Sequence, residues 1–241
     1  MSGQGPKIDY GIDAPRVVFN LGLWGVVALA IAISRWDIHL GPVIFLHQGF
    51  YYPGAILTAQ SAIMLYYSKL GKFRHRDQML ARISWRGDEQ VLDVGTGRGL
   101  LLIGAAKHLT TGRAIGIDIW SQKDLSSNSA ESTKANIQAE GVADRCELRS
   151  EPAQKMTFPS DSFDVIVSNQ CLHNIPSSTE RDVACAEIVR VLKPGGRIVI
   201  SDFINTGHYA KEFRKGGLDV QLAGWFPPSR LVCGQKPAIS K

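Results

Sequence analysis

Hydrophobic residues are distributed along the chain in two different ways, and the change occurs near residue 88. Residues 17–33, VVFNLGLWGVVALAIAI, contain no charged side chain, and Arg16 and Ser34 bound them. A helix of these seventeen residues would reach roughly 26 Å, slightly less than the ~30 Å hydrocarbon core of a bilayer. The pattern predicts a hydrophobic helix that either inserts into a membrane or is buried in a protein interior or an oligomer interface.

A second, weaker apolar stretch covers residues 40–67 and is interrupted by His47, Gln48, Pro53 and Gln60. Pro53 predicts the start of a helix, because proline is favoured in the first helical turn. We expect this helix to be amphipathic or interfacial rather than a second full membrane span, and to lie on a membrane surface or to cover the following domain as a lid. Basic residues then follow closely, as in a cytosolic segment beside a membrane or on a solvated helix face. They are Lys69, Lys72, Arg74, Arg76, Arg82 and Arg86.

From residue 88 onward, short apolar runs alternate with helical patterns. The predicted strands are 91–94, 113–118, 145–149, 163–169 and 196–203, and the predicted helices are 101–109, 129–140 and 180–192. Such alternation is typical of a parallel sheet with helices on both faces, and the tail 218–237 has the strand propensity for a closing hairpin. We predict a doubly wound, mostly parallel seven-stranded α/β domain in residues 69–241, preceded by a hydrophobic helical region in residues 1–68.

Charge and cysteine content narrow the function only slightly. The net charge of +5 and the pI near 9.1 are compatible with an acidic partner or an anionic membrane, but nucleic-acid binders usually concentrate basic residues on one face. The cysteines are widely spaced and form no CxxC pair that would suggest zinc or a redox dithiol. We therefore expect no metal site and four buried free thiols, which are Cys146, Cys171, Cys185 and Cys233.

The first predicted strand of this domain ends in a glycine loop, VLDVGTGRG. Gly95, Gly97 and Gly99 leave out side chains where a ligand could approach the backbone. A dinucleotide fingerprint, GxGxxG, would need another glycine where this chain has Leu100. Asp118 ends the next strand, nineteen residues after Gly99, where a carboxylate can accept hydrogen bonds from both ribose hydroxyls. The spacing predicts a nucleoside site at the carboxyl ends of the strands.

Several motifs in this region resemble those of the class I S-adenosylmethionine-dependent methyltransferases, in the order found in that family. VLDVGTGRG resembles the first family motif and GIDIW the second. SEPAQKMTFPSDSFDVIVSNQCLHNI resembles the segment that carries an adenine-binding acid, and RVLKPGGRIVISDF is typical of the small-molecule branch. The resemblance covers roughly residues 70–236. It implies a Rossmann-like methyltransferase fold with S-adenosylmethionine as the cofactor.

The resemblance also implies which residues hold that cofactor. The family often has Asp-Ala where this chain has Glu151 and Pro152, so the carboxylate is kept but the backbone N–H after it is lost. Simpler structural roles stay open: a tight turn for the glycines, a helix cap for Asp118 and an exposed loop charge for Glu151. The expected cofactor-binding residues are Asp93, Gly95, Gly97, Gly99, Asp118, Ile119, Glu151 and Asn169.

Methyl transfer from a sulfonium requires mainly that the acceptor is positioned in line with the reacting bond. A general base is needed only if the acceptor must lose a proton, and His173 is the candidate because it follows the fourth strand. A histidine that merely packs this loop is an equal alternative. Cys171 lies where arsenite methyltransferases would need a thiol, but the other cooperating cysteines of that family are not evident. The loop SNQC lacks the Asn/Asp-Pro-Pro-aromatic turn of nucleic-acid amine methyltransferases.

The acceptor is expected to be a small, lipophilic molecule, because the segment before the first strand is apolar. We expect membrane association through residues 17–33 and 40–67 with the catalytic domain facing the cytosol; the alternative is a soluble cytoplasmic protein. A membrane-anchored scaffold that binds the cofactor without transferring a methyl group is a second function compatible with the same motifs. An NAD-dependent oxidoreductase is a third. The oligomeric state is left open by the sequence.

Overall fold

The structure is a computed structural model that describes residues 8–34, 36–226 and 229–238. The chain forms two compact units. The sheet unit consists, among the described residues, of 8–10, 73–121 and 127–238 without 227–228, and the hairpin unit consists of 11–72 and 122–126. Each unit is described by itself below.

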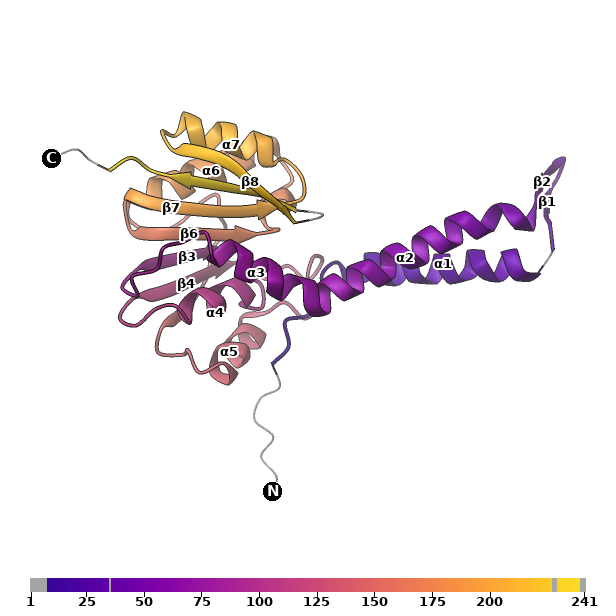
Figure 1. Cartoon of the computed structure of the whole chain (residues 1–241), viewed down its shortest axis with the longest axis horizontal. Helices are drawn as coiled ribbons and strands as arrows, with labels where there is room; N and C mark the ends of the chain where they lie inside the picture. The colour runs from indigo at the N-terminus through magenta and orange to yellow at the C-terminus, as the bar shows by residue number, and fades with distance from the viewer. Residues whose placement is uncertain (1–7, 35, 227–228, 239–241) are drawn as a thin grey trace, which may run out of the picture. The chain divides into compact units, whose positions relative to one another are not determined.

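The sheet unit is built around a seven-stranded sheet with the order β5-β4-β3-β6-β7-β9-β8 (Figure 1). Strands β3 to β7 are parallel to their neighbours, β9 is antiparallel to β7, and β8 is antiparallel to β9. The predicted doubly wound, mostly parallel seven-stranded fold is confirmed. The strands are β3 (Gln90–Val94), β4 (Arg113–Asp118), β5 (Cys146–Ser150), β6 (Phe163–Asn169), β7 (Leu192–Asp202), β8 (Asp219–Phe226) and β9 (Ser229–Gln235).

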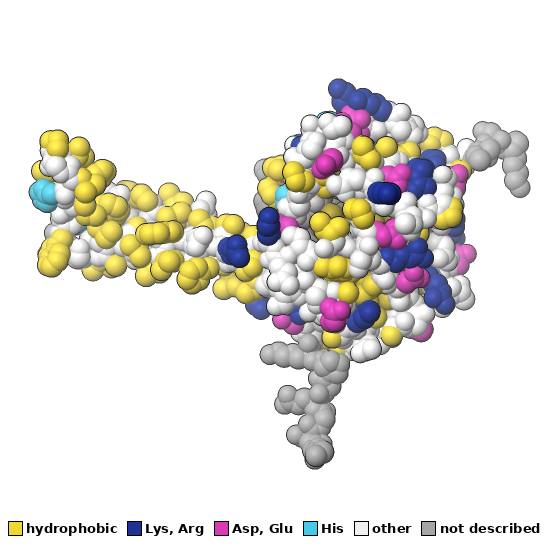
Figure 2. Space-filling view, turned by 180° about the vertical axis from the view of Figure 1, so that it is seen from behind, with side chains coloured by type: hydrophobic (Ala, Val, Ile, Leu, Met, Phe, Trp, Pro, Cys, Tyr) yellow, Lys and Arg dark blue, Asp and Glu magenta, His cyan; other side chains and the backbone are white. Residues whose placement is uncertain are grey.

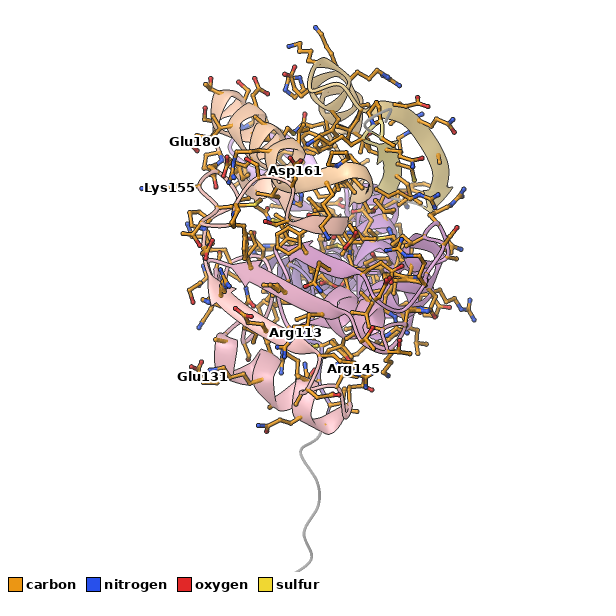
Figure 3. All side chains as sticks on the ribbon, turned by 90° about the vertical axis from the view of Figure 1, so that its left-hand side faces the viewer. Arg113, Glu131, Arg145, Lys155, Asp161 and Glu180 are labelled. Carbon is orange, nitrogen blue, oxygen red and sulfur yellow. The ribbon has the colours of Figure 1, made fainter. Side chains whose placement is uncertain are left out.

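Helices cover both faces of this sheet, because successive strand residues point to opposite sides. Val91 belongs to one apolar core with Leu102, and the adjacent Leu92 belongs to the other core with Phe213. Charged side chains such as Glu131 lie on the outer surface of the helical layers (Figure 3). The helices are α3 (Lys72–Leu80), α4 (Leu100–Ala106) and α5 (Ala130–Ala139) with the first core, and α6 (Ser178–Val191) and α7 (Thr206–Lys215) with the second.

Two parts of the sheet unit differ from the sequence prediction. Helix α7 was not predicted, because only Tyr209, Ala210 and Phe213 provide its buried apolar side chains within a polar segment. Strand β7 begins at Leu192 instead of at residue 196, so the residues KPGG lie inside the strand. A register shift against β6 and the positive φ of 80° at Gly195 accommodate these extra residues as an irregularity of the ladder.

The hairpin unit contains two hydrophobic helices that pack side by side (Figure 1). The second helix begins two residues before Pro53 and continues directly into a π-helix. Among the described residues, α1 is the one single helix that is long and apolar enough to be a candidate membrane span, and 17% of its most apolar window is buried. The elements are α1 (Pro15–Ser34), β1 (Ile38–Leu40), β2 (Val43–Phe45), η1 (His47–Phe50), α2 (Tyr51–Tyr66) and the π-helix η2 (Tyr67–Gly71).

Polar contacts fix the end of the hairpin unit where α1 begins and η2 ends. Ser68 Oγ accepts a hydrogen bond from the backbone N–H of Asp13 at 3.1 Å, and Lys72 Nζ donates to the carbonyl of Gly11 at 2.8 Å. Lys72 is buried, so this member of the basic segment stabilises the fold and is not presented to a membrane surface. Residues 122–126 join the same end, where the backbone N–H of Ala14 donates to the carbonyl of Asp124 at 2.8 Å.

Candidate functional site

The candidate site lies at the carboxyl ends of β3, β4 and β6, which are neighbours in the sheet. Val94, Asp118 and Asn169 are the last residues of these three parallel strands. Ligands of open parallel sheets bind in the crevice outside such strand ends. The expected site residues on these three strands and in the loops after them are therefore brought to one edge of the sheet.

The glycine loop after β3 has a backbone that only glycine adopts without strain. Gly95, Gly97 and Gly99 have φ values of 75°, 53° and 84°, all in the left-handed region. The N–H groups of Gly95 and Thr96 donate to the carbonyl of Ile117 at 2.9 and 3.0 Å, which fixes the loop to the end of β4. A Cβ atom at Gly95 would collide with Cys171 Sγ, so the loops after β3 and β6 are in close contact.

Asp118 joins this loop to the end of β4 through its carboxylate. Its Oδ2 accepts a hydrogen bond from the Gly97 N–H at 2.8 Å, and its Oδ1 accepts one from the Trp120 N–H at 2.6 Å. The side-chain amide of Asn128 approaches Oδ1 at 3.4 Å. A carboxylate offers about four lone-pair sites, so capacity is left for hydroxyl donors of a ligand.

Asp93 lies one residue before the end of β3 and is 1% exposed. Its Oδ2 accepts a hydrogen bond from Thr96 Oγ1 at 2.8 Å, which holds the start of the glycine loop. Burial raises the pKa of Asp93 to about 7, the Thr96 hydrogen bond opposes this effect, and the negative charge of Asp118 adds to it. This carboxyl group is part of the loop's internal support.

The loop after β6 contributes an amide oxygen with an unused acceptor capacity. Asn169 Oδ1 is buried and has no hydrogen-bond partner within the part of the chain that the structure describes. Gln170 follows with a φ of 51°, and its N–H donates to the carbonyl of Ser201 at 2.8 Å. Buried polar atoms are usually satisfied, so this oxygen fits a ligand that brings a hydrogen-bond donor to the strand end.

His173 is oriented by a buried carboxylate at the end of β7. Its Nδ1 lies 2.8 Å from Asp202 Oδ1, without hydrogen-bond alignment, and its backbone N–H donates to Asp202 Oδ2 at 3.1 Å. Asp202 is 0% exposed, and the imidazole ring packs edge-on against Phe203 with a centroid distance of 4.4 Å. The backbone hydrogen bond and the contact with Phe203 hold this residue at the strand end, an arrangement compatible with proton transfer at Nε2.

Two expected site residues, Ile119 after β4 and Glu151 after β5, lie outside this cluster. Ile119 is 68% exposed and makes an apolar surface next to Asp118. Glu151 follows β5 and accepts hydrogen bonds from the N–H and Oγ1 of Thr157 at 2.9 and 2.7 Å. Its carboxylate thus stabilises the turn that follows it, and its expected contact with adenine stays a prediction.

The sequence analysis missed a polar cluster that joins the glycine loop to α5 and to residue 9. The side-chain amide of Asn136, on α5, donates to the carbonyls of Arg98 and Asp9, both at 2.9 Å. Asp9 N–H donates back to Asn136 Oδ1 at 3.0 Å, and its carboxylate lies 3.1 Å from Arg98. An asparagine within a predicted helix was the only signal in the sequence, and residues 9 and 136 are 127 positions apart.

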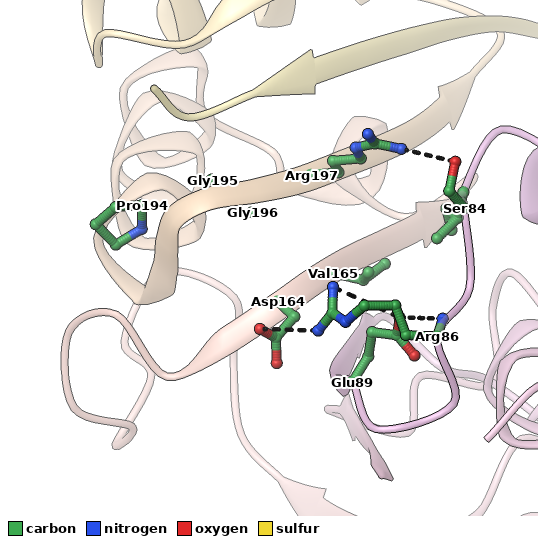
Figure 4. Close-up of a pocket in the computed structure, with 10 residues that line it drawn as sticks. Ser84, Arg86, Glu89, Asp164, Val165, Pro194, Gly195, Gly196 and Arg197 are labelled. Atoms are coloured by element: carbon green, nitrogen blue, oxygen red, sulfur yellow. Dashed lines mark hydrogen bonds and ion pairs between the residues drawn. The ribbon is translucent and has the colours of Figure 1, made fainter. Parts of the chain in front are cut away.

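A hollow with a cavity volume of about 440 Å³ lies at the opposite edge of the sheet, at the amino ends of β6 and β7 (Figure 4). Its charged groups already have protein partners: Asp164 pairs with Lys193 at 2.8 Å, and Glu89 accepts from the Arg86 N–H at 2.6 Å. None of the expected site residues lines this hollow, because they lie at the carboxyl ends of the strands.

Comparison with known proteins gives a family assignment for the domain. Residues 92–200 match the family model described as a methyltransferase domain. The chain is 35% identical over 132 residues to a demethylmenaquinone methyltransferase of Lactiplantibacillus plantarum, covering 54% of this chain and 52% of that protein. It is 33% identical over 121 residues to the sterol 4-C-methyltransferase strm-1 of Caenorhabditis elegans, covering 50% of this chain and 33% of that protein. The chain spans about half or less of the length of these relatives.

A solved structure agrees with this result at the level of the fold. A putative methyltransferase from Bacillus halodurans matches with a TM-score of 0.57 and 15% identity, covering 68% of this chain and 100% of that structure. The glycine loop, the acid at the end of β4 and the mostly parallel seven-stranded sheet found here are those expected from the motif resemblance. Residues 92–200 thus match a methyltransferase domain, and the motifs and the fold agree with the class I S-adenosylmethionine-dependent methyltransferases, for which S-adenosylmethionine is the cofactor.

Proposed function

We propose that this chain transfers a methyl group from S-adenosylmethionine to a small, lipophilic acceptor. The observation that carries the proposal is the clasp between the glycine loop and Asp118, in which the Gly97 N–H donates to Asp118 Oδ2 at 2.8 Å. The clasp presents a carboxylate with free lone pairs beside a backbone that has no side chains. This is the combination that a nucleoside with two ribose hydroxyls requires.

The residues at the strand ends fit S-adenosylmethionine. Asp118 would accept hydrogen bonds from the ribose hydroxyls. Asn169 Oδ1, which has no partner among the described residues, would accept one from a donor such as the cofactor's amino group. Glu151 and the exposed Ile119 are proposed for the adenine end, and Asp93 supports the loop. The cofactor supplies a methyl group already activated on a sulfonium, so the chain's own task is to bind, orient and exclude water.

We propose His173 as the proton acceptor where the methyl acceptor must be deprotonated. The Asp202 carboxylate lies 2.8 Å from Nδ1 and would favour the tautomer that leaves Nε2 free to take a proton. Asp202 itself is fully buried and acts as a positioning residue. An acceptor that is already nucleophilic would need only to be held in line, and His173 would then pack the loop.

The lipophilic class of acceptor is supported by the chain's own hydrophobic segment and by the relatives. The two curated relatives above are named for demethylmenaquinone and for sterol methylation. We propose that residues 17–33 and 40–67 associate with a membrane and that the catalytic domain faces the cytosol. Such an enzyme would reach acceptors that are dissolved in the bilayer.

The test is methyl transfer by the full-length protein in detergent micelles or vesicles. The protein is incubated with S-adenosylmethionine carrying a labelled methyl group and either a total lipid extract or a panel of polar metabolites. We expect label in the organic phase with the lipid extract, and at least a tenfold loss with Asp118→Asn. Asp144→Asn is the matched control, because Asp144 is an exposed acid. Label in polar products alone would contradict the lipophilic acceptor, and cofactor binding without transfer to either set would support a scaffold.

A further inference from the structure

The surface of the hairpin unit is hydrophobic on the sides where a water-soluble helix pair would be polar. Large apolar side chains on both helices are strongly exposed, among them Phe19 at 66%, Trp24 at 61% and Ile63 at 66%. Figure 2 shows hydrophobic side chains over the visible face of this hairpin. Between Val17 and Ser68 the only Lys, Arg, Asp or Glu residues are Arg35 and Asp37. The sheet unit, by contrast, exposes many charged side chains (Figure 3).

Small residues, in contrast, form the contact between α1 and α2. The buried residues of α1 are Gly25, Ala28 and Ala32, and the buried residue of α2 is Gly54. A Cβ atom at Gly25 would lie 2.5 Å from Thr58 Oγ1 and 2.7 Å from its backbone nitrogen. Large residues outside and small residues at a close helix contact are typical of helices packed within a membrane.

The polar side chains at this contact are satisfied within the hairpin. Ser61 Oγ on α2 donates to the carbonyl of Val18 on α1 at 2.8 Å, and Thr58 Oγ1 donates to the carbonyl of Gly54 at 2.8 Å. The exposed polar residues Asn20, in the second turn of α1, and Gln60, near the middle of the α2–η2 arm, are uncharged. Such a hairpin leaves few unpaired polar groups for a hydrocarbon environment.

Both arms of the hairpin have the length of a membrane span. The twenty residues of α1 correspond to about 30 Å, and so do α2 and η2 together at about 1.5 Å per residue. Aromatic residues occur at both ends: Trp36, Tyr51 and Tyr52 are exposed near the turn, and Tyr66 is exposed near the opposite end. Tyrosine and tryptophan at two levels separated by one bilayer thickness are typical of the two membrane interfaces.

We infer that α1 and α2–η2 both cross the bilayer as a transmembrane hairpin, with β1 and β2 at the far surface and both chain ends on the cytosolic side. The occupant of the apolar surface is the lipid hydrocarbon. Arg16 and Lys69 are exposed at the end of the hairpin where α1 begins and η2 ends. The turn contains one arginine and one acid between residues 35 and 46. The positive-inside rule therefore places the end with Arg16 and Lys69 on the cytosolic side. The inference makes the proposed membrane association specific and does not depend on methyl transfer.

Glycosylation mapping of the full chain tests this topology. The sequence has no Asn-x-Ser/Thr acceptor of its own, so single acceptors can be added in flexible spacers before residue 8, after Gly41 and after residue 238. Gly41 suits an insertion, because no atom of the described residues lies within 4 Å of the position of its Cβ. After translation into microsomes, we expect glycosylation of the Gly41 acceptor alone and resistance of the chain to carbonate extraction.

Other patterns would overturn the inference. Glycosylation of one terminus without the other would indicate a single span, and an unmodified, carbonate-extractable chain would indicate that a protein partner or a second copy covers the hairpin. Modification of both termini without the turn would overturn the orientation. Correct topology without methyl transfer in the assay above would contradict the proposed function alone.

Lysine substitutions on the two helices provide an independent readout. Val26→Lys and Ile63→Lys place a charge near the middle of each arm at positions 59% and 66% exposed, and each should lower glycosylation of the Gly41 acceptor at least fivefold. Val183→Lys, at a position 44% exposed on α6, is the matched control and should change nothing. Loss with Val26→Lys but not with Ile63→Lys would contradict a second span.

Discussion

Gly95→Ala tests the contact between the two loops that build the site. The substitution has two costs: a left-handed φ of 75° for a residue with a Cβ, and a collision of that Cβ with the Cys171 side chain. The backbone cost is about 1 kcal/mol and overpacking adds about 2 kcal/mol. A total of about 3 kcal/mol lowers the melting temperature of a chain of this size by roughly 6–12 °C.

Matched variants separate the two costs. Gly141→Ala carries the backbone cost alone, because Gly141 has a φ of 69° with nothing within 4 Å of its Cβ position, and should lower the melting temperature by roughly 2–4 °C. Cys171→Gly removes the colliding atoms and leaves Cα at 3.7 Å, so the double variant should recover about 2 kcal/mol relative to additivity. Thermal unfolding of the full-length protein in detergent measures all four variants. Equal effects of Gly95→Ala and Gly141→Ala, or strict additivity with Cys171→Gly, would refute the reasoning.

Three further predictions concern titratable groups. Burial raises the pKa of Asp93 to about 7 from its ordinary 3.8, so the folded state binds more protons than the unfolded state between these two pH values. The free energy of unfolding therefore falls as the pH rises through this range, by up to about 4 kcal/mol. Asp93→Asn should make the melting temperature less dependent on pH. Burial also raises the pKa of Cys185 to about 12, so mass spectrometry should show alkylation at pH 8 about 10³-fold slower than for an ordinary thiol until the protein unfolds. Asp202→Asn should slow methyl transfer to an acceptor that loses a proton about tenfold or more and shift its pH profile, with unchanged affinity for S-adenosylhomocysteine.

The sequence predicted the sheet well because its strands are short, apolar and separated by clear turn residues. Strands β4 and β6 have the predicted bounds, 113–118 and 163–169, since Gly112 and Asp118 mark the ends of β4, and Asp161 and Asn169 mark those of β6. Helix α7 was missed, because its apolar face has few residues and hydrophobic periodicity carries little signal in so polar a segment. The early start of β7 depends on pairing with β6 around a bulge, and no local pattern specifies such pairing.

The site was predictable where spacing alone specifies it. The glycine loop and Asp118 meet as expected, because β3 and β4 are parallel neighbours and both end at the same edge. The buried role of Lys72 and the contact between Asn136 and Asp9 could not be predicted, since both depend on segments far apart in the sequence. Likewise, the small-residue contact between α1 and α2 becomes visible only when the two helices are placed side by side.

The most direct test of the account is calorimetric titration of the full-length protein with S-adenosylhomocysteine, for the wild type and for Asp118→Ala. The account predicts saturable binding of one molecule per chain, and about 10²-fold weaker binding by Asp118→Ala through loss of two charge-assisted hydrogen bonds. Equal affinity of the two proteins, or no binding by the wild type, would contradict it.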